Sequence, residues 1–167
     1  SQHLPVGNFR WLTKKDIEAF DIHSVKLNGR TGYFLEVDLI YPKDLHDVHN
    51  DYPLAPEKRT INPDDWSEYM HTIADCLDMK KKSGGDKLMA TLHDKMNYIV
   101  HFKNLKLYLR LGLYLAKIHR IVSFDQRPFM KKYIDLNIQK RKMATSSFEI
   151  ALYKGYNNHV FGMTMYN

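Results

Sequence analysis

The hydrophobic period of this sequence changes along the chain, and that change most restricts the folds it can adopt. In residues 32–41, GYFLEVDLIY, large apolar side chains occupy every second position, which is typical of a half-buried strand. Further strands are predicted at residues 87–92 and 97–102, on either side of Asp94-Lys95, and at 113–124. From Pro128 onward the apolar residues instead follow a helical spacing. The sequence therefore predicts an α+β fold, with a mostly antiparallel sheet followed by helices.

The segments between these elements are predicted from their turn-forming residues. Four prolines mixed with polar residues favour an extended or looping course for residues 42–65. Residues 80–85, KKKSGG, indicate a flexible charged turn. Asn104 is placed to cap a brief helix that Gly112 ends. Residues 4–7 are expected to form an irregular opening.

Two predicted helices, residues 128–142 and 147–160, are joined by a short link. Ser146 and Glu149 have the spacing of a capping box, so the second helix should begin directly after Ser146. The link of residues 143–146 allows only a tight reversal, and the helices are therefore predicted to pack antiparallel. One side of the first helix carries polar and basic residues, which are Lys131, Lys132, Asn137, Lys140 and Arg141.

Charge is distributed unevenly along the chain. Residues 1–79 hold 8 Lys+Arg against 14 Asp+Glu, whereas residues 80–142 hold 16 Lys+Arg against 4 Asp, within a total of +6. A concentrated cationic segment is typical of a partner that carries phosphates. The alternative is a lysine-rich surface that serves only to keep the protein solvated.

Several classes of protein are disfavoured by composition. No stretch of about 18 apolar residues occurs, and no signal-peptide pattern opens the chain, so we expect an intracellular protein of the nucleus or cytoplasm without a membrane partner. The single cysteine, Cys76, has no partner for an internal disulfide, and we expect it to be packed as a small apolar residue. Trp11 and Trp66 are likewise expected in the core rather than as platforms for stacking bases.

Residues 154–162, KGYNNHVFG, contain a spaced set of functional side chains. On a helix Lys154 and Asn158 are four positions apart and share a face, and Phe161 extends that face. The segment resembles the fingers motif of family B DNA polymerases, K-x-x-x-N-S-x-Y-G. Gly162 matches the motif glycine.

Other segments extend the resemblance in the same order. Residues 32–56, 97–124 and 133–137 are similar to the palm and early fingers of protein-primed family B polymerases carried by Polinton or Maverick transposons and related viruses. The opening, SQHLPVGNFRW, resembles the segment directly after the first catalytic aspartate motif there. We therefore expect an internal fragment, with a partial palm and insertion region in residues 1–126. Residues 127–167 would then form the fingers helices.

The resemblance implies roles for particular residues. Lys154 would bind the phosphates of the incoming nucleotide together with Asn158, Phe161 and Gly162, and Lys142 would assist from the preceding helix. Contacts with DNA are assigned to Lys140, Arg141 and His159. The alternative for residues 140–142 is a solvated helix end that complements the helix dipole. The implied partners are template and primer DNA, a deoxynucleoside triphosphate and a terminal protein that serves as primer.

Departures from the motif support a different interpretation. His159 stands where the family has serine, and Phe161 replaces tyrosine. Residues 163–166, MTMY, stand where related transposon sequences read KTME. The alternative function is therefore a degenerate or domesticated transposon remnant that binds nucleic acid without catalysis.

The metal chemistry of a polymerase is not predicted within this chain. Phosphoryl transfer uses two divalent ions about 4 Å apart, held by aspartates from separate strands. Asp38 superficially resembles the first catalytic motif, D-x-x-S-L-Y-P, but its spacing to Tyr41 is two residues too short. His46 and His49 lack the i, i+4 spacing of a zinc-binding helix, and the prolines around them argue against a helix. We therefore assign Mg²⁺ to the complete polymerase and no metal to this chain.

Overall fold

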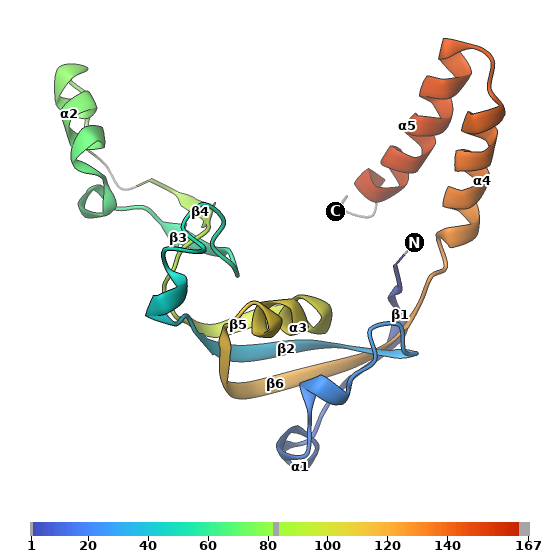
Figure 1. Ribbon diagram of the computed structural model, residues 1–167, viewed down its shortest axis with the longest axis horizontal. Helices are drawn as coiled ribbons and strands as arrows, with labels where there is room; N and C mark the ends of the chain where they lie inside the picture. The colour runs from blue at the N-terminus through green and yellow to red at the C-terminus, as the bar shows by residue number, and fades with distance from the viewer. Residues whose placement is uncertain (1, 82–83, 164–167) are drawn as a thin grey trace. The chain divides into compact units, whose positions relative to one another are not determined.

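The computed structural model describes residues 2–81 and 84–163, except for the side chain of Phe161. Within these residues the main sheet has the strand order β1-β6-β2-β5, and β3 and β4 form a separate pair (Figure 1). The strands are β1 (Leu4–Trp11), β2 (Thr31–Ile40), β3 (Glu57–Thr60), β4 (Asp86–Met89), β5 (Lys95–His101) and β6 (Tyr114–Arg127). The helices are α1 (Lys14–Glu18), α2 (Glu68–Cys76), α3 (Phe102–Arg110), α4 (Lys131–Met143) and α5 (Ser147–Met163). The predicted α+β class is confirmed, and the pairs β1–β6, β2–β5 and β3–β4 are antiparallel.

The chain forms two compact units. The first consists of residues 1–13, 23–33 and 122–167, and the second of residues 14–22 and 34–121. Strands β2 and β6 contribute residues to both units. The functional division predicted at residues 126 and 127 stays a prediction. No helix in the part of the chain that the structure describes is both long and apolar enough to cross a membrane.

The core of the second unit is built on β2, as its alternating sequence predicts. Leu35, Val37 and Leu39 are fully buried because successive side chains of a strand point to opposite faces. Asp38 is also buried, at 8% exposure. Its carboxylate accepts the backbone N–H of Asn97, 2.8 Å away, at a bulge where β5 has one residue more than β2. Asn97 has φ +52° there, a conformation that asparagine tolerates better than most residues.

Helix α3 covers part of this core through Phe102 and Leu105, which are fully buried (Figure 1). The helix was predicted, but its cap was not. His101, rather than Asn104, caps it, because its Nδ1 accepts the N–H of Lys103 at 3.3 Å. Burial, with Lys103 nearby, lowers the pKa of His101 and so favours the neutral ring that can accept this bond. Gly112, with φ +105°, follows the helix end.

The two strands predicted around Asp94-Lys95 do not pair with each other. Strand β4 pairs with β3, and β5 pairs with β2. The expected loop at residues 42–65 therefore contains a strand, β3, at Glu57–Thr60. Residues 82 and 83 of the predicted flexible turn lie outside the described residues. Hydrophobic periodicity identified β4 as a strand, but it carries no information on which partner a strand selects.

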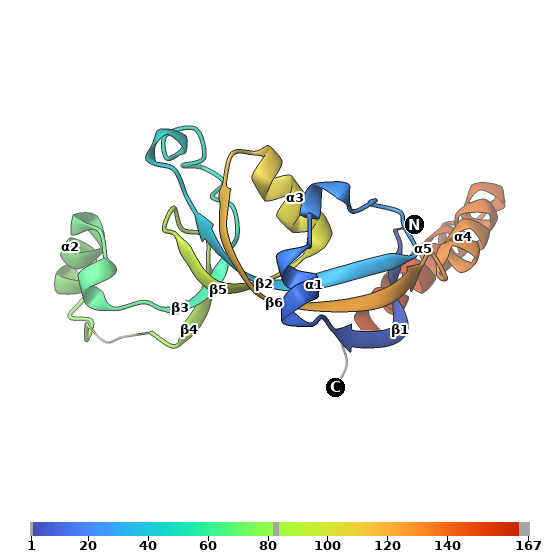
Figure 2. The same ribbon diagram turned by 90° about the horizontal axis from the view of Figure 1, so that it is seen from below.

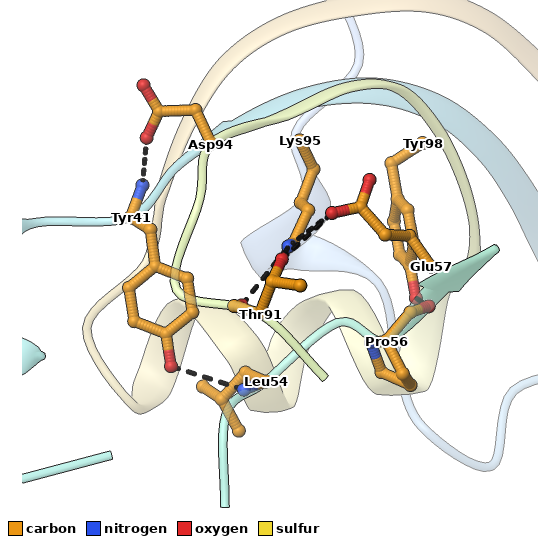
Figure 3. A network of polar contacts seen from close by, with 8 residues as sticks. All are labelled: Tyr41, Leu54, Pro56, Glu57, Thr91, Asp94, Lys95 and Tyr98. Atoms are coloured by element: carbon orange, nitrogen blue, oxygen red, sulfur yellow. Dashed lines mark hydrogen bonds and ion pairs between the residues drawn. The ribbon is translucent and has the colours of Figure 1, made fainter. Parts of the chain in front are cut away.

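A buried lysine joins the β3–β4 pair to β5 (Figure 3). Lys95 is 1% exposed, and its ammonium donates to Glu57 Oε1 at 2.9 Å, to the Thr91 carbonyl and to the Thr91 hydroxyl. Beside it the Tyr98 hydroxyl donates to the Pro56 carbonyl at 3.0 Å. Burial raises the pKa of Tyr98, which keeps this donor protonated. These bonds satisfy a charge that would otherwise be costly to bury.

Acid should weaken this junction. Burial alone would raise the pKa of Glu57, but the hydrogen bonds from Lys95 and Thr91 outweigh it and leave the pKa below its ordinary value of 4.5. The stabilisation from Glu57 is therefore complete above pH 4.5 and is lost as the pH falls through the lowered pKa. We expect Glu57→Gln to reduce the acid sensitivity of unfolding, measured by circular dichroism against pH. An unchanged acid profile in that variant would contradict this role.

The first unit begins with a strand that was not predicted from the sequence. Residues 4–7 were expected to be irregular, yet they open β1, which pairs with the end of β6. Gly7 at φ +149° and Asn8 at φ +55° accompany shifts in the register of this pair. Proline and glycine near a strand edge hide the period-two pattern while remaining compatible with pairing at bulges.

Helices α4 and α5 form the predicted antiparallel hairpin and lie side by side (Figures 1 and 2). The capping box is present. The Ser146 hydroxyl accepts the N–H of Glu149 at 3.2 Å, and the Glu149 carboxylate accepts the N–H of Ser146 at 3.4 Å. Three predictions of exposure were wrong. Asn137 is buried instead of outward, whereas Cys76 and Trp11 are exposed instead of packed.

Candidate nucleotide-binding site

The contacts between α4 and α5 determine toward which side of the hairpin the remaining side chains start. The Asn137 side-chain amide donates to Asn157 Oδ1 at 3.0 Å, and this bond explains why Asn137 is buried. One turn further along, the Lys140 ammonium lies 5.8 Å from the centroid of the Tyr153 ring, within cation–π range. Lys140, predicted to contact DNA, therefore holds its ammonium near the Tyr153 ring while the residue remains exposed.

Three of the predicted site residues each follow a contact residue by one position. These are Asn158 after Asn157, Lys154 after Tyr153, and Arg141 after Lys140. One position turns a side chain by about 100° around the helix axis. Because the two helices run in opposite directions, a rotation of about 100° away from the contact points toward the same side of the hairpin on both helices. All three residues are exposed.

Helix rise gives the heights of these side chains along the hairpin. The contacts Asn137–Asn157 and Lys140–Tyr153 place Arg141 nearly level with residues 152 and 153. At about 1.5 Å per residue, the backbone positions of Arg141 and Lys154 differ by only about 2–3 Å along the axis. The side chains of Arg141 and Lys154 therefore start from one side of the hairpin at nearly the same height.

Lys142 lies elsewhere on the same helix turn. It follows Lys140 by two positions, which corresponds to about 200° around α4, and it is exposed. Its side chain therefore starts from the outer side of α4, away from Tyr153. Whether its ammonium reaches the space beside Lys154 stays a prediction. Arg141, assigned to DNA from the sequence, starts closer to Lys154.

The remaining motif residues differ in what the structure describes. His159 Nδ1 donates to the Gly155 carbonyl at 2.8 Å, so its ring lies along its own helix. Gly162 is exposed, and a Cβ added there would meet no atom within 4 Å. The side chain of Phe161 and residues 164–166, where the sequence departs from the family, lie outside the described residues.

The electrostatics of the hairpin favour an anion. Its two acidic side chains are engaged, Asp135 by Lys131 at i, i+4 and Glu149 by the capping box. Arg141, Lys142 and Lys154 are exposed, and the described residues provide none of them with an ion-pair partner. Adjacent cations of this kind attract phosphate groups more strongly than isolated ones.

The cationic segment of residues 80–142 should bind single- or double-stranded DNA weakly, with affinity that falls steeply as salt rises, because DNA phosphates release their counterions when they bind to the protein. A triple variant in which Lys140, Arg141 and Lys142 are each replaced by glutamine should show a shallower fall of log K with log salt. The magnitude of that slope should decrease by about 2–3 for duplex DNA. Titrations by fluorescence anisotropy at several salt concentrations measure this slope. Binding that is insensitive to salt would show that the charge is incidental.

Two of the side chains considered as metal ligands, Asp38 and His49, are hydrogen-bonded within the fold. Asp38 accepts the Asn97 N–H and lies 2.8 Å from His119 Nε2, and these two contacts lower its pKa in that order of importance. His49 Nδ1 hydrogen-bonds to the Tyr41 hydroxyl at 2.8 Å. Among residues 2–81 and 84–163, no group of three His, Cys, Asp or Glu side chains is arranged to hold a metal ion.

Comparisons of this chain with protein-family models, with curated proteins and with solved structures found no match. The likeness to family B polymerases therefore depends on the residues and spacings of the sequence itself. The geometry of α4 and α5 is independent of that likeness.

Proposed function

We propose that this chain is part of a DNA-directed DNA polymerase, and that the α4–α5 hairpin holds the incoming deoxynucleoside triphosphate. One observation carries the proposal: Lys154 and Asn158 are exposed on one side of α5 with the motif spacing, level with Arg141 of α4. In the proposed protein residues 1–126 contribute part of the palm and an insertion region that helps hold template and protein primer. Residues 127–167 are the fingers.

The proposed roles follow from the chemistry of each group. The Lys154 ammonium binds triphosphate oxygens through charge-assisted hydrogen bonds. Asn158 lies one turn further along α5, toward the base-pair end, and Phe161 supplies a flat apolar surface to the nascent pair. From α4, Arg141, which starts on the same side as Lys154, is the nearer cation, and Lys142 assists. The developing charge of phosphoryl transfer is stabilised mainly by such positioned cations together with metal ions.

Mg²⁺ is assigned to aspartates outside this chain. Asp38 is the residue here that most resembles a catalytic aspartate, and Asn97 and His119 already engage its carboxylate. This donor set does not fit a two-metal centre, which needs carboxylates free to bridge two ions.

The isolated chain should therefore incorporate no nucleotide, even with Mg²⁺. A primer-extension assay with the pure 167-residue protein measures this directly. The matched positive control is the same chain with its flanking coding sequence, which we expect to contain an aspartate motif on each side and to extend the primer. Template-dependent extension by the 167-residue chain alone would refute the assignment of the metal ligands.

The second candidate is a transposon-derived protein that binds nucleic acid without catalysis. His159 favours it, because a bulkier ring replaces the motif serine and bonds to its own helix at the Gly155 carbonyl. The flanking sequence separates the two functions. Intact aspartate motifs followed by primer extension support the polymerase, whereas DNA binding without extension by the complete protein supports the remnant.

A further inference from the structure

A groove of about 670 Å³ lies in the first unit, and none of its lining residues belongs to the α5 motif. It is formed where β1 begins beside the end of β6 and where the chain enters α4. Its lining residues are Pro5, Val6, Arg127, Pro128, Phe129 and Lys132. The volume falls within the range of small-molecule sites in proteins, about 300–1,000 Å³.

The groove combines an open aromatic ring with two unpaired cations. Phe129, in the link between β6 and α4, is 53% exposed, and Val6 of β1 is 39% exposed. Arg127 and Lys132 are exposed, and the described residues provide neither with an ion-pair partner. Within the described part of the chain, no acidic side chain lines the groove.

Nearby charges are already engaged, which leaves the groove cationic. Asp125 accepts from the Asn8 amide at 2.8 Å and lies 3.8 Å from Arg30. Lys131, the neighbour of Lys132, pairs with Asp135. The two cations of the groove therefore remain available to a bound anion.

We propose that this groove binds single-stranded nucleic acid, with a base stacked on Phe129 and adjacent phosphates at Arg127 and Lys132. Aromatic side chains beside cations are the usual means of holding single strands, because every base offers a face for stacking. A duplex cannot use the site in this way, since its bases are already stacked. The proposal does not depend on the polymerase assignment, because the groove and the α5 motif share no residue.

The test uses the whole 167-residue chain and a fluorescent oligothymidylate, with anisotropy measured at several salt concentrations. Phe129→Leu keeps an apolar side chain but removes the stacking face, and it should weaken binding by about fivefold or more. Lys132→Gln should weaken binding and make its salt dependence shallower, with the magnitude of the slope of log K against log salt reduced by about 0.7. Thermal unfolding checks that both variants, which alter exposed residues, remain folded.

Two matched control variants alter residues of α4, the helix that carries Lys132. Tyr133→Leu removes an exposed ring outside the groove, and Lys131→Gln removes an ion-paired lysine, so both should bind like the parent chain. Equal losses in the controls and the groove variants would overturn the proposal, as would an absence of binding by the parent. Loss of binding in Lys154→Gln, with Phe129→Leu unaffected, would also overturn it while leaving the proposed nucleotide site intact.

Discussion

If the proposed function holds, replacing Lys154 with alanine in the complete protein should raise the KM for deoxynucleotides by about 10- to 150-fold, because the change would remove a charge-assisted contact to the triphosphate worth about 1.5–3 kcal/mol. Lys154 is exposed on α5, so the substitution should leave the fold intact. Steady-state kinetics at saturating primed template measure the effect.

Two variants act as controls for this result. Lys154→Arg keeps the positive charge and should retain part of the nucleotide affinity, whereas Lys131→Ala removes a lysine that pairs with Asp135 and should change KM little. An unchanged KM in Lys154→Ala would move the decisive phosphate contact to α4. The KM values of Arg141→Gln and Lys142→Gln then show which of the two residues makes that contact. Arg141 is level with Lys154, whereas Lys142 lies on the outer side of α4.

The largest loss of stability should follow from Phe102→Ala. Phe102 is fully buried at the start of α3, and truncation of such a ring leaves a cavity that costs about 3–5 kcal/mol. Urea unfolding followed by circular dichroism should show a midpoint shifted to much lower urea. Phe102→Leu fills more of the space and should lose less.

Ile99→Ala provides the matched surface control for this core. Ile99 belongs to the adjacent strand β5 but is 70% exposed, so its replacement should change stability by no more than about 0.5 kcal/mol. If Phe102→Ala unfolded at the same urea concentration as Ile99→Ala, α3 could not be packed on the sheet as described.

Local sequence rules predicted the elements whose signals are contained within a few residues. The alternation of Leu35, Val37 and Leu39 predicted a half-buried strand, and all three are buried. The capping box of Ser146 and Glu149 predicted the start of α5. In both cases the interacting groups are close in sequence, so their spacing alone determines the geometry.

Long-range partners could not be predicted in this way. Strand β4 pairs with β3 across the intervening α2, and nothing in its own sequence distinguishes β3 from β5 as a partner. Asn137 was predicted outward because it is polar, yet a single bond to Asn157, twenty positions later, makes its burial favourable. The placement of Arg141 beside Lys154 likewise depends on the contacts between two helices.

The candidate site rests on the sequence for its residues and on the fold for part of its arrangement. The motif spacing led to the prediction of Lys154 and Asn158, which stays a prediction, and helix geometry suffices to place them on one face. The groove at Phe129 was missed because its walls come from β1, the end of β6 and the start of α4, and β1 has no period-two pattern in its sequence. The available signal was a pair of cations, Arg127 and Lys132, on either side of an aromatic residue.

The most direct test of the proposed function is a structure of the complete protein with primed template and an incoming deoxynucleoside triphosphate. We predict that Lys154 Nζ lies within hydrogen-bonding distance, about 2.7–3.2 Å, of a triphosphate oxygen. Asn158 should face the same side of α5, and Arg141 should be the nearest cation of α4. A triphosphate held by other residues, with Lys154 directed into solvent, would contradict the proposed function.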